Sequence, residues 1–165
     1  MIRAPRKFNG TFITRHFFPG FFQIKDVAAI NRGKCYDWAY IAHRLYGVQL
    51  WSTDYHAWVE AMMPSPENTT ESIGGYSWKP MVRRYFDSET PKGVSNFLTL
   101  GCNRRNSHPV PWEDQHPIRM TLIEFKEFWN HIGSGRRYHW DSHLEPQLKD
   151  VLKDRYKGVT PILST

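Results

Sequence analysis

One cysteine stands where a helix is expected to begin, and its type and position favour covalent chemistry. In the stretch NRGKCYDWAYIAHRLYG, Cys35 follows Gly33 and Lys34 and precedes apolar residues at helical spacing. The unpaired N–H groups at a helix N-terminus lower the pKa of a thiol, because they stabilise the negative charge of the thiolate. Cys35 is therefore a candidate nucleophile, and we expect its pKa to lie below the ordinary value of about 8.5.

A cysteine nucleophile needs a base and a group that orients the base. His56 begins the strand-like stretch HAWVEA, and Asp87 ends the strand-like stretch in YFDSET. A hairpin between these two strands would place His56 beside Asp87, so the sequence predicts a Cys-His-Asp triad. Asp54 and Glu60 are alternatives to Asp87, although Glu60 lies roughly 13 Å along the strand from His56.

Two further considerations bear on the triad. His43 lies eight residues along the helix from Cys35, about 12 Å away, and is therefore out of reach as its base. Cys35 also shares the inward helix face with Trp38, where a cysteine is usually a core residue. A thiol open to a cleft would favour an enzyme, and a thiol sealed beneath side chains would favour a binding protein.

The histidines near the C-terminus do not carry the signature of a metal site. His139 and His143 are four residues apart, as zinc ligands on one helix face can be, and His131 lies nearby. Neither an HExxH motif nor paired cysteines accompany them. We interpret them as exposed or capping side chains and expect no bound metal.

Taken together, GKCYDWAY, HAWVEA and YFDSET resemble the transglutaminase-like (papain-like) cysteine-nucleophile superfamily. NRGKC is also similar to the R-G-G-x-C of arylamine N-acetyltransferases, and HAWVE and YFDSE are similar to small phage-encoded members. The resemblance covers residues 31–90 and implies Cys35 as nucleophile, His56 as base and Asp87 as orienting group. It further implies an α+β fold in which the nucleophile helix packs on an antiparallel sheet.

The resemblance implies acyl transfer or amide hydrolysis through a cysteine thioester, as in a protease, a deamidase, a transglutaminase or an acetyltransferase. The spacing from Cys35 to His56 is shorter than is common in the superfamily, and an insertion over 63–75 lengthens the span to Asp87. Gln23 is too far upstream to serve as an oxyanion donor, so we expect the backbone N–H of Cys35 in that role. No cofactor is expected, except an acyl-coenzyme A donor for the acetyltransferase variant. The alternative is a non-catalytic viral protein that uses the same scaffold to bind and inhibit a host protein.

The charge balance limits the partners. The chain has 22 basic and 16 acidic residues, a net charge of +6 and a pI near 9.4. The densest basic clusters are isolated pairs: Arg83-Arg84, Arg104-Arg105 and Arg136-Arg137. We therefore expect only weak, non-specific nucleic-acid binding. The resemblance implies a protein or peptide as substrate, or a host protein as target.

The sequence also favours a cytoplasmic protein, in the host cytoplasm if it is phage-encoded. No apolar run reaches the roughly 18 residues that a membrane span requires, and the N-terminus lacks the apolar region of a signal peptide. Cys35 and Cys102 are too few for a disulfide scaffold, so we expect two separate free thiols in a reducing compartment.

The elements that must position the triad are expected to form a single domain over 1–165. Helical spacing predicts a helix over 34–46 that ends at Gly47. Strands are predicted over 55–63 and 79–86, joined by a long exposed loop over 63–75.

Two helices are expected in the C-terminal part, 118–158. A capping box of Thr121 and Glu124 opens one that ends at Gly133, and Pro146 opens another that ends at Gly158. Residues 8–25, with turn signals at Asn9-Gly10 and Pro19-Gly20, are expected to form one or two short strands or an aromatic-rich arm. Further expectations are a helical turn over 27–31, and irregular structure over 91–117 with a short strand over 97–100. This order of elements indicates an α+β fold.

Overall fold

The computed structural model describes residues 8–18, 30, 34–53, 56–65, 70–100, 116–133 and 144–155, without the side chains of 131–133, 154 and 155. In these parts of the chain the elements follow the order α1 (Gly10–Phe17), α3 (Cys35–Tyr46), β1 (Gln49–Ser52), β2 (Ala57–Pro64), β3 (Glu71–Ile73), β4 (Tyr76–Trp78), β5 (Met81–Phe86), the 3₁₀ turn η1 (Phe97–Thr99), β6 (Ile118–Met120), α5 (Leu122–Gly133) and α6 (Leu144–Arg155). The predicted α+β class is confirmed. No helix within these residues is long and apolar enough to cross a bilayer.

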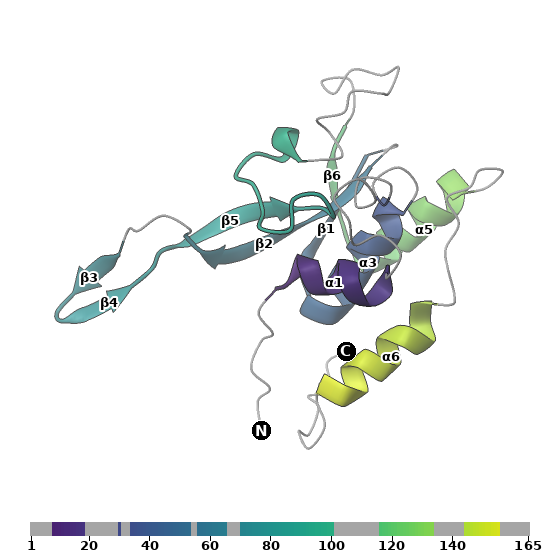
Figure 1. Ribbon diagram of the computed structural model, residues 1–165. Helices are drawn as coiled ribbons and strands as arrows, with labels where there is room; N and C mark the ends of the chain where they lie inside the picture. Colours follow the sequence, from purple (N-terminus) through teal and green to yellow (C-terminus); the bar gives the residue numbers. More distant parts are fainter. Residues whose placement is uncertain are drawn as a thin grey trace.

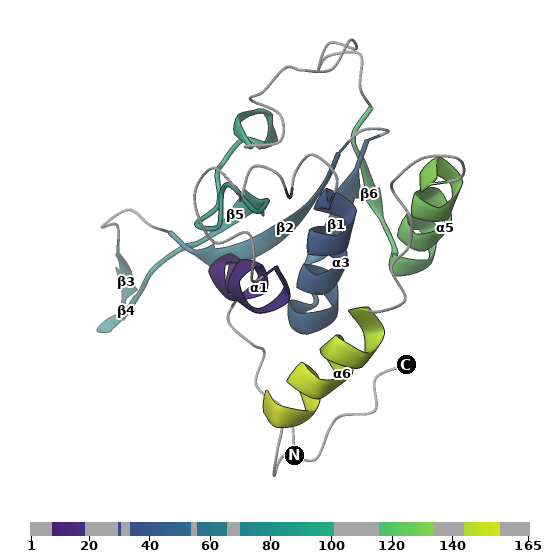
Figure 2. The ribbon, with the colours of Figure 1, turned by 45° about the vertical axis from the view of Figure 1, so that its right-hand side comes forward.

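The main sheet has four antiparallel strands in the order β5-β2-β1-β6, and the helices gather on one of its faces (Figures 1 and 2). Leu50 of β1 pairs with Val59 of β2, and Val59 pairs with Phe86 of β5. All three side chains are buried in one cluster with the inward residues of α3. The predicted pairing of the two strands on either side of the 63–75 segment is therefore confirmed.

The helix α3 matches its prediction at both ends. Cys35 is its first residue, and Gly47 follows its last residue in the left-handed conformation, with φ 71°. The Gly47 N–H donates to the carbonyl oxygen of His43 at 2.8 Å and satisfies one of the final carbonyl groups. Because Trp38 and Ile41 are both buried, α3 is the central helix of the core.

Helix α5 begins with the predicted capping box. The Glu124 N–H donates to Thr121 Oγ1 at 3.2 Å, and the Thr121 N–H donates to Glu124 Oε1 at 2.9 Å. Helix α6 begins at Leu144, two residues before the expected Pro146, and its predicted end at Gly158 lies outside the described residues.

An ion pair joins α6 to α3. Arg44 Nη1 lies 2.8 Å from Glu145 Oε1, and the Tyr40 hydroxyl also donates to this carboxylate. The apolar side chains of α6 that complete the core are Leu144, Leu148 and Val151.

The opposite face of the sheet carries an aromatic cluster. Trp51 and Trp58 stack with ring centroids 6.0 Å apart, and Phe97 stacks on both. Leu100 is fully buried beside Trp58. Phe97 belongs to η1, so the short strand expected over 97–100 is wrong: the Asn96 side chain caps a 3₁₀ turn by accepting from the Leu98 N–H.

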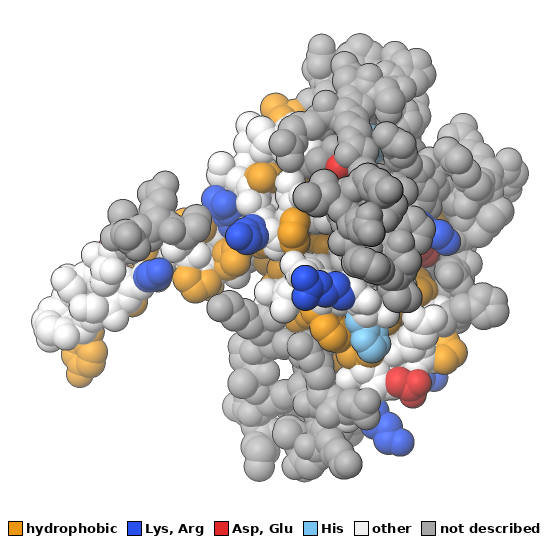
Figure 3. All heavy atoms as spheres, in the orientation of Figure 1, with side chains coloured by type: hydrophobic (Ala, Val, Ile, Leu, Met, Phe, Trp, Pro, Cys, Tyr) orange, Lys and Arg blue, Asp and Glu red, His pale blue; other side chains and the backbone are white. Residues whose placement is uncertain are grey.

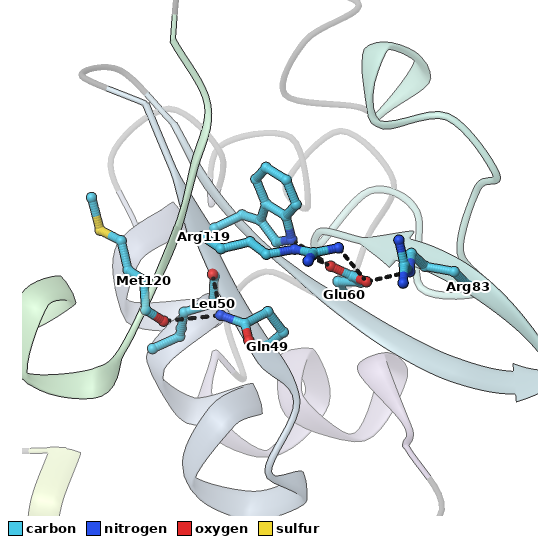
Figure 4. Close-up of polar contacts among 7 residues, drawn as sticks. Gln49, Leu50, Glu60, Arg83, Arg119 and Met120 are labelled. Atoms are coloured by element: carbon cyan, nitrogen blue, oxygen red, sulfur yellow. Dashed lines mark hydrogen bonds and ion pairs between the residues drawn. The ribbon is translucent and has the colours of Figure 1, made fainter.

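Glu60 links the four strands across this same face (Figure 4). Its carboxylate lies 2.6 Å from Arg83 Nε of β5 and 3.2 Å from Arg119 Nε of β6. It also accepts a 2.8 Å hydrogen bond from Trp51 Nε1 of β1. Beside it, Gln49 Nε2 donates to the Met120 carbonyl oxygen and adds a second link between β1 and β6.

The N-terminal expectation is wrong in the described part of 8–25. Residues 10–17 form α1, because the Asn9 side chain accepts from the Phe12 N–H at 3.1 Å and caps a helix instead of starting a turn. Ile13 and Phe17, four residues apart, are buried against α3. Residues 19–29 lie outside the described part, and of the turn expected over 27–31 only Ile30 is described, as helical and buried.

The segment expected as a long loop over 63–75 contains ordered pairing. The strands β3 and β4 form a two-stranded ribbon that projects from the body (Figures 1 and 2). Its tight turn holds Gly74 and Gly75 at φ 57° and 86°, a conformation that favours glycine. Residues 66–69 lie outside the described part.

The ribbon presents apolar side chains to solvent. Ile73 pairs with Tyr76 across the turn, and these residues are 73% and 79% exposed. Trp78 lies on the same face, because alternate residues of a strand point the same way, and it is 40% exposed. Figure 3 shows apolar side chains at the outer end of the ribbon.

We predict that Glu60→Gln lowers the free energy of unfolding by about 1–3 kcal/mol, because the substitution leaves two arginines without their shared carboxylate. Urea unfolding of the parent and the variant measures this change. Glu127→Gln, on an exposed position of α5, is the matched control and should change stability by less than about 0.5 kcal/mol. Equal stability of Glu60→Gln and the parent would contradict the role assigned to Glu60.

Candidate active site

The Cys35 thiol lies where the N-terminus of α3 meets the start of β2. It is a free cysteine and only 1% exposed. The backbone N–H groups of Ala57 and Tyr36 hydrogen-bond to it, and the carboxylates of Asp37 and Asp87 lie close enough to act on it electrostatically. The structure therefore gathers the thiol, the residue after His56, and Asp87 in one place.

His56 occupies the turn between β1 and β2, immediately before the first residue of β2, and is 9% exposed. Two hydrogen bonds across the turn hold its backbone. The Thr53 N–H donates to the His56 carbonyl oxygen at 2.8 Å, and the His56 N–H donates to Thr53 Oγ1 at 3.1 Å. The sequence predicted a strand over 55–63 that includes His56, but β2 begins at Ala57, so His56 precedes the strand.

Asp87 follows the last residue of β5 and is 1% exposed. Its Oδ1 accepts from Thr90 Oγ1 at 2.6 Å, from the Thr90 N–H at 2.8 Å and from the Glu89 N–H at 3.0 Å. Because all three bonds end on one oxygen, they fix the orientation of the whole carboxylate. The turn after β5 thus holds Asp87 in one direction.

Burial decides the protonation of Cys35. Loss of hydration raises the pKa of the thiol from 9.0 to about 12, with a smaller contribution from the carboxylates of Asp37 and Asp87. The N–H groups of Ala57 and Tyr36 lower the pKa, but they do not offset the burial. The expected depression of the Cys35 pKa is wrong for this closed state, in which the residue is a neutral thiol.

Two other residues that the sequence offered as partners of Cys35, Glu60 and His43, lie away from it in the structure. Glu60, considered as an orienting carboxylate, is bound instead to Arg83 and Arg119 on the far face of the sheet. His43 Nδ1 lies 2.7 Å from the Val48 carbonyl oxygen at the other end of α3, which agrees with its exclusion as the base.

Several candidates fall outside the described part of the chain, namely Asp54, Cys102, His139, His143 and the side chain of His131. Among the described residues, no group of three or more potential ligating side chains could hold a metal ion.

Sequence analysis missed three residues that surround the turn of His56: Tyr36, Ser52 and Thr53. All three are buried. The Tyr36 hydroxyl donates to the Thr53 carbonyl oxygen at 2.7 Å, and Ser52 Oγ lies 3.0 Å from the Tyr36 hydroxyl. One signal was present, since a threonine three residues before the histidine has the spacing of a side-chain-closed turn.

We predict that alkaline pH destabilises the parent more than Cys35→Ala. A raised folded-state pKa means that the unfolded thiol ionises from 9.0 upward while the folded thiol keeps its proton to about 12. The stability associated with the thiol is therefore complete below the lower value and is lost as pH rises toward the upper one. Across this window the parent should lose about 1.4 kcal/mol per pH unit more than Cys35→Ala, as measured by urea unfolding under reducing conditions.

A change in the relative stability of the parent in the opposite direction would contradict this prediction. If the parent instead gains stability relative to Cys35→Ala as the pH rises toward 9.0, the native thiol ionises below its ordinary pKa. That result would show that the helix N-terminus and the imidazole dominate over burial.

The chain was compared with known proteins in three ways. No protein-family model, no curated protein and no solved structure matches it.

Proposed function

We propose that the chain is a cysteine-dependent acyltransferase or amide hydrolase with a transglutaminase-like (papain-like) core. Cys35 is the nucleophile, His56 the base and Asp87 the orienting carboxylate. The observation that carries this proposal is the convergence at Cys35. Its thiol accepts from the N–H of Ala57, which directly follows His56, and it lies within electrostatic range of Asp87. These groups come from α3, the start of β2 and the end of β5, in the order that the sequence motifs predict.

The chemistry begins from a neutral thiol, because burial keeps the pKa of Cys35 high. His56 removes the Sγ proton as the sulfur attacks the acyl carbon, and the carbonyl electrons move to oxygen. Backbone N–H groups at the start of α3 stabilise that oxygen. The leaving group then takes the proton from His56, and a thioester remains on Cys35.

The thioester is resolved by a second nucleophile that His56 deprotonates. Water gives hydrolysis, as in a protease or deamidase, and an amine gives transfer. Asp87 keeps the ring in the required orientation and stabilises its cationic form. Neither route requires a cofactor, and an acyl-coenzyme A would serve only as an acyl donor.

Access to the site requires movement, since Cys35 and Asp87 are each only 1% exposed. Substrate binding must expose the thiol before attack. We propose a protein or peptide as substrate and the cytoplasm as its location, on the basis of the superfamily resemblance and the expected reducing compartment.

We predict that p-nitrophenyl acetate acetylates Cys35. The thiol sulfur forms a bond to the acetyl carbon, and p-nitrophenolate leaves. Its release is followed by absorbance, and the acetyl group is located by peptide mass spectrometry. Cys35→Ala should abolish modification at this position, and His56→Ala should slow it by about 100-fold or more. Asp87→Asn should retain part of the rate, because the ring remains as base with the wrong orientation.

Two controls separate the proposed site from general reactivity. His43→Gln changes a histidine of the same helix that lies away from Cys35 and should acetylate at the parental rate. Cys102→Ala removes the other cysteine and should also leave the rate unchanged. Acetylation of folded protein at a rate that does not depend on His56 would contradict the proposed base.

A second candidate function is a non-catalytic protein that binds and inhibits a partner. Two observations favour it: the sealed Cys35 thiol and the exposed apolar face of the β3–β4 ribbon. Tyrosine and tryptophan are frequent energetic centres of protein interfaces, and Tyr76 and Trp78 are exposed there. If acyl probes leave Cys35 unmodified in folded protein, this candidate is the better one. Partner binding should then survive Cys35→Ala and fail in the combined variant Ile73→Ser, Tyr76→Ser, Trp78→Ser.

A further inference from the structure

We infer that Tyr36 and Thr53 are positioning residues, which set where His56 stands relative to Cys35. The inference rests on the proposed function, because it concerns the rate at which His56 takes the thiol proton. Neither residue is required to touch the substrate. Tyr36 acts through its hydroxyl, which donates to the Thr53 carbonyl oxygen, and Thr53 acts through its N–H and its Oγ1, which bond to the backbone of His56.

Thr53 forms two hydrogen bonds with the backbone of His56. Ser52 and Ala57 form the last registered pair of β1 and β2, so Thr53 and His56 are the described ends of the connection between them. The Thr53 N–H donates to the His56 carbonyl oxygen, and Thr53 Oγ1 accepts from the His56 N–H. Both backbone polar groups of His56 are thereby bound to one residue, which holds the backbone from which its side chain starts.

Tyr36 ties this turn to the nucleophile. It directly follows Cys35 in α3, and its hydroxyl donates to the Thr53 carbonyl oxygen at 2.7 Å. Ser52 Oγ lies 2.8 Å from the same carbonyl oxygen and 3.2 Å from the His56 carbonyl oxygen. The distance between nucleophile and base is therefore set through one side chain whose backbone is joined to Cys35.

The ring of Tyr36 is itself held by α5. It stacks on Trp129 with centroids 6.0 Å apart, and its centroid lies 5.6 Å from that of Phe125. Both of these residues are buried. A helix far along the sequence thus orients the hydroxyl that reaches the turn of His56.

The test uses substitutions that keep shape and remove one polar group. Thr53→Val replaces the hydroxyl by a methyl group, and Tyr36→Phe removes only the phenolic oxygen. We expect each to lower kcat for acetylation by p-nitrophenyl acetate by about 10- to 100-fold, since a shift of about 1 Å costs that much, with KM changed by less than about threefold. Thr53→Ser keeps Oγ and should restore most of the rate.

Matched controls account for lost stability. Thr14→Val removes a buried hydroxyl that accepts from Trp38 Nε1 at 3.1 Å, away from the turn. Tyr46→Phe removes a hydroxyl of the same helix that lies 3.4 Å from the Asn9 carbonyl oxygen. Both controls should acetylate within about twofold of the parent, even where the free energy of unfolding falls by about 1 kcal/mol.

A readout independent of activity separates this inference from the proposed function. The His56 ring resonance in a ¹H–¹³C NMR spectrum should move in Thr53→Val and Tyr36→Phe and stay in place in Thr14→Val. If the parent is not acetylated but the resonance moves as expected, the proposed function fails and the positioning role stands.

The inference is overturned by either of two results. One is a folded Thr53→Val or Tyr36→Phe that keeps the parental kcat and the parental His56 resonance. The other is a Thr53→Ser that loses as much rate as Thr53→Val, because the hydroxyl would then not be the group that matters.

Discussion

The arrangement of the candidate site depends on the hydrogen bond from the Tyr36 hydroxyl to the Thr53 carbonyl oxygen. This bond joins the first turn of α3 to the turn between β1 and β2 and adds a polar link to the apolar packing of α3 on these strands. It is buried, so breaking it would leave polar groups without water, at a cost of about 1–3 kcal/mol. The bond therefore links the helix that begins at Cys35 to the connection between β1 and β2, which ends at His56.

The burial of Cys35 opposes the effect that a helix N-terminus has on the pKa of a thiol. The start of a helix favours a thiolate, but removal from water disfavours any charge, and burial raises the pKa of Cys35 to about 12. A shift of this size corresponds to about 4 kcal/mol, more than a helix N-terminus supplies. The buried Cys35 is therefore a neutral thiol, and in the proposed mechanism its proton passes to His56 when the site opens.

The two faces of the sheet are stabilised by different kinds of contact. The face toward α3 holds the apolar core, which includes Cys35. The other face is held by stacked tryptophans and by Glu60, which neutralises two arginines from the outer strands. Because Glu60 is committed to that face, it cannot serve Cys35. The β3–β4 ribbon projects from the body as a separate two-stranded sheet (Figure 3).

The sequence by itself determined those features that depend on neighbours a few residues apart. The helix that begins at Cys35 and stops before Gly47 follows from the spacing of its apolar residues and from the glycine at its end. The cap formed by Thr121 and Glu124 follows from two side chains three residues apart. In contrast, Asn9 matched both a turn and a helix cap, and burial of Ile13 against α3 selected the helix.

The tertiary structure decided what depends on distant partners. β1 and β6 are too short to show a period, so only pairing identifies them. The hydroxyl of Tyr36 finds its acceptor in another element, and Glu60 finds its arginines on two other strands. The protonation of Cys35 is the clearest case. Ala57 of β2 and the neighbouring Tyr36 supply the N–H groups that lower its pKa, and the hydration that it loses depends on the packing of the whole core.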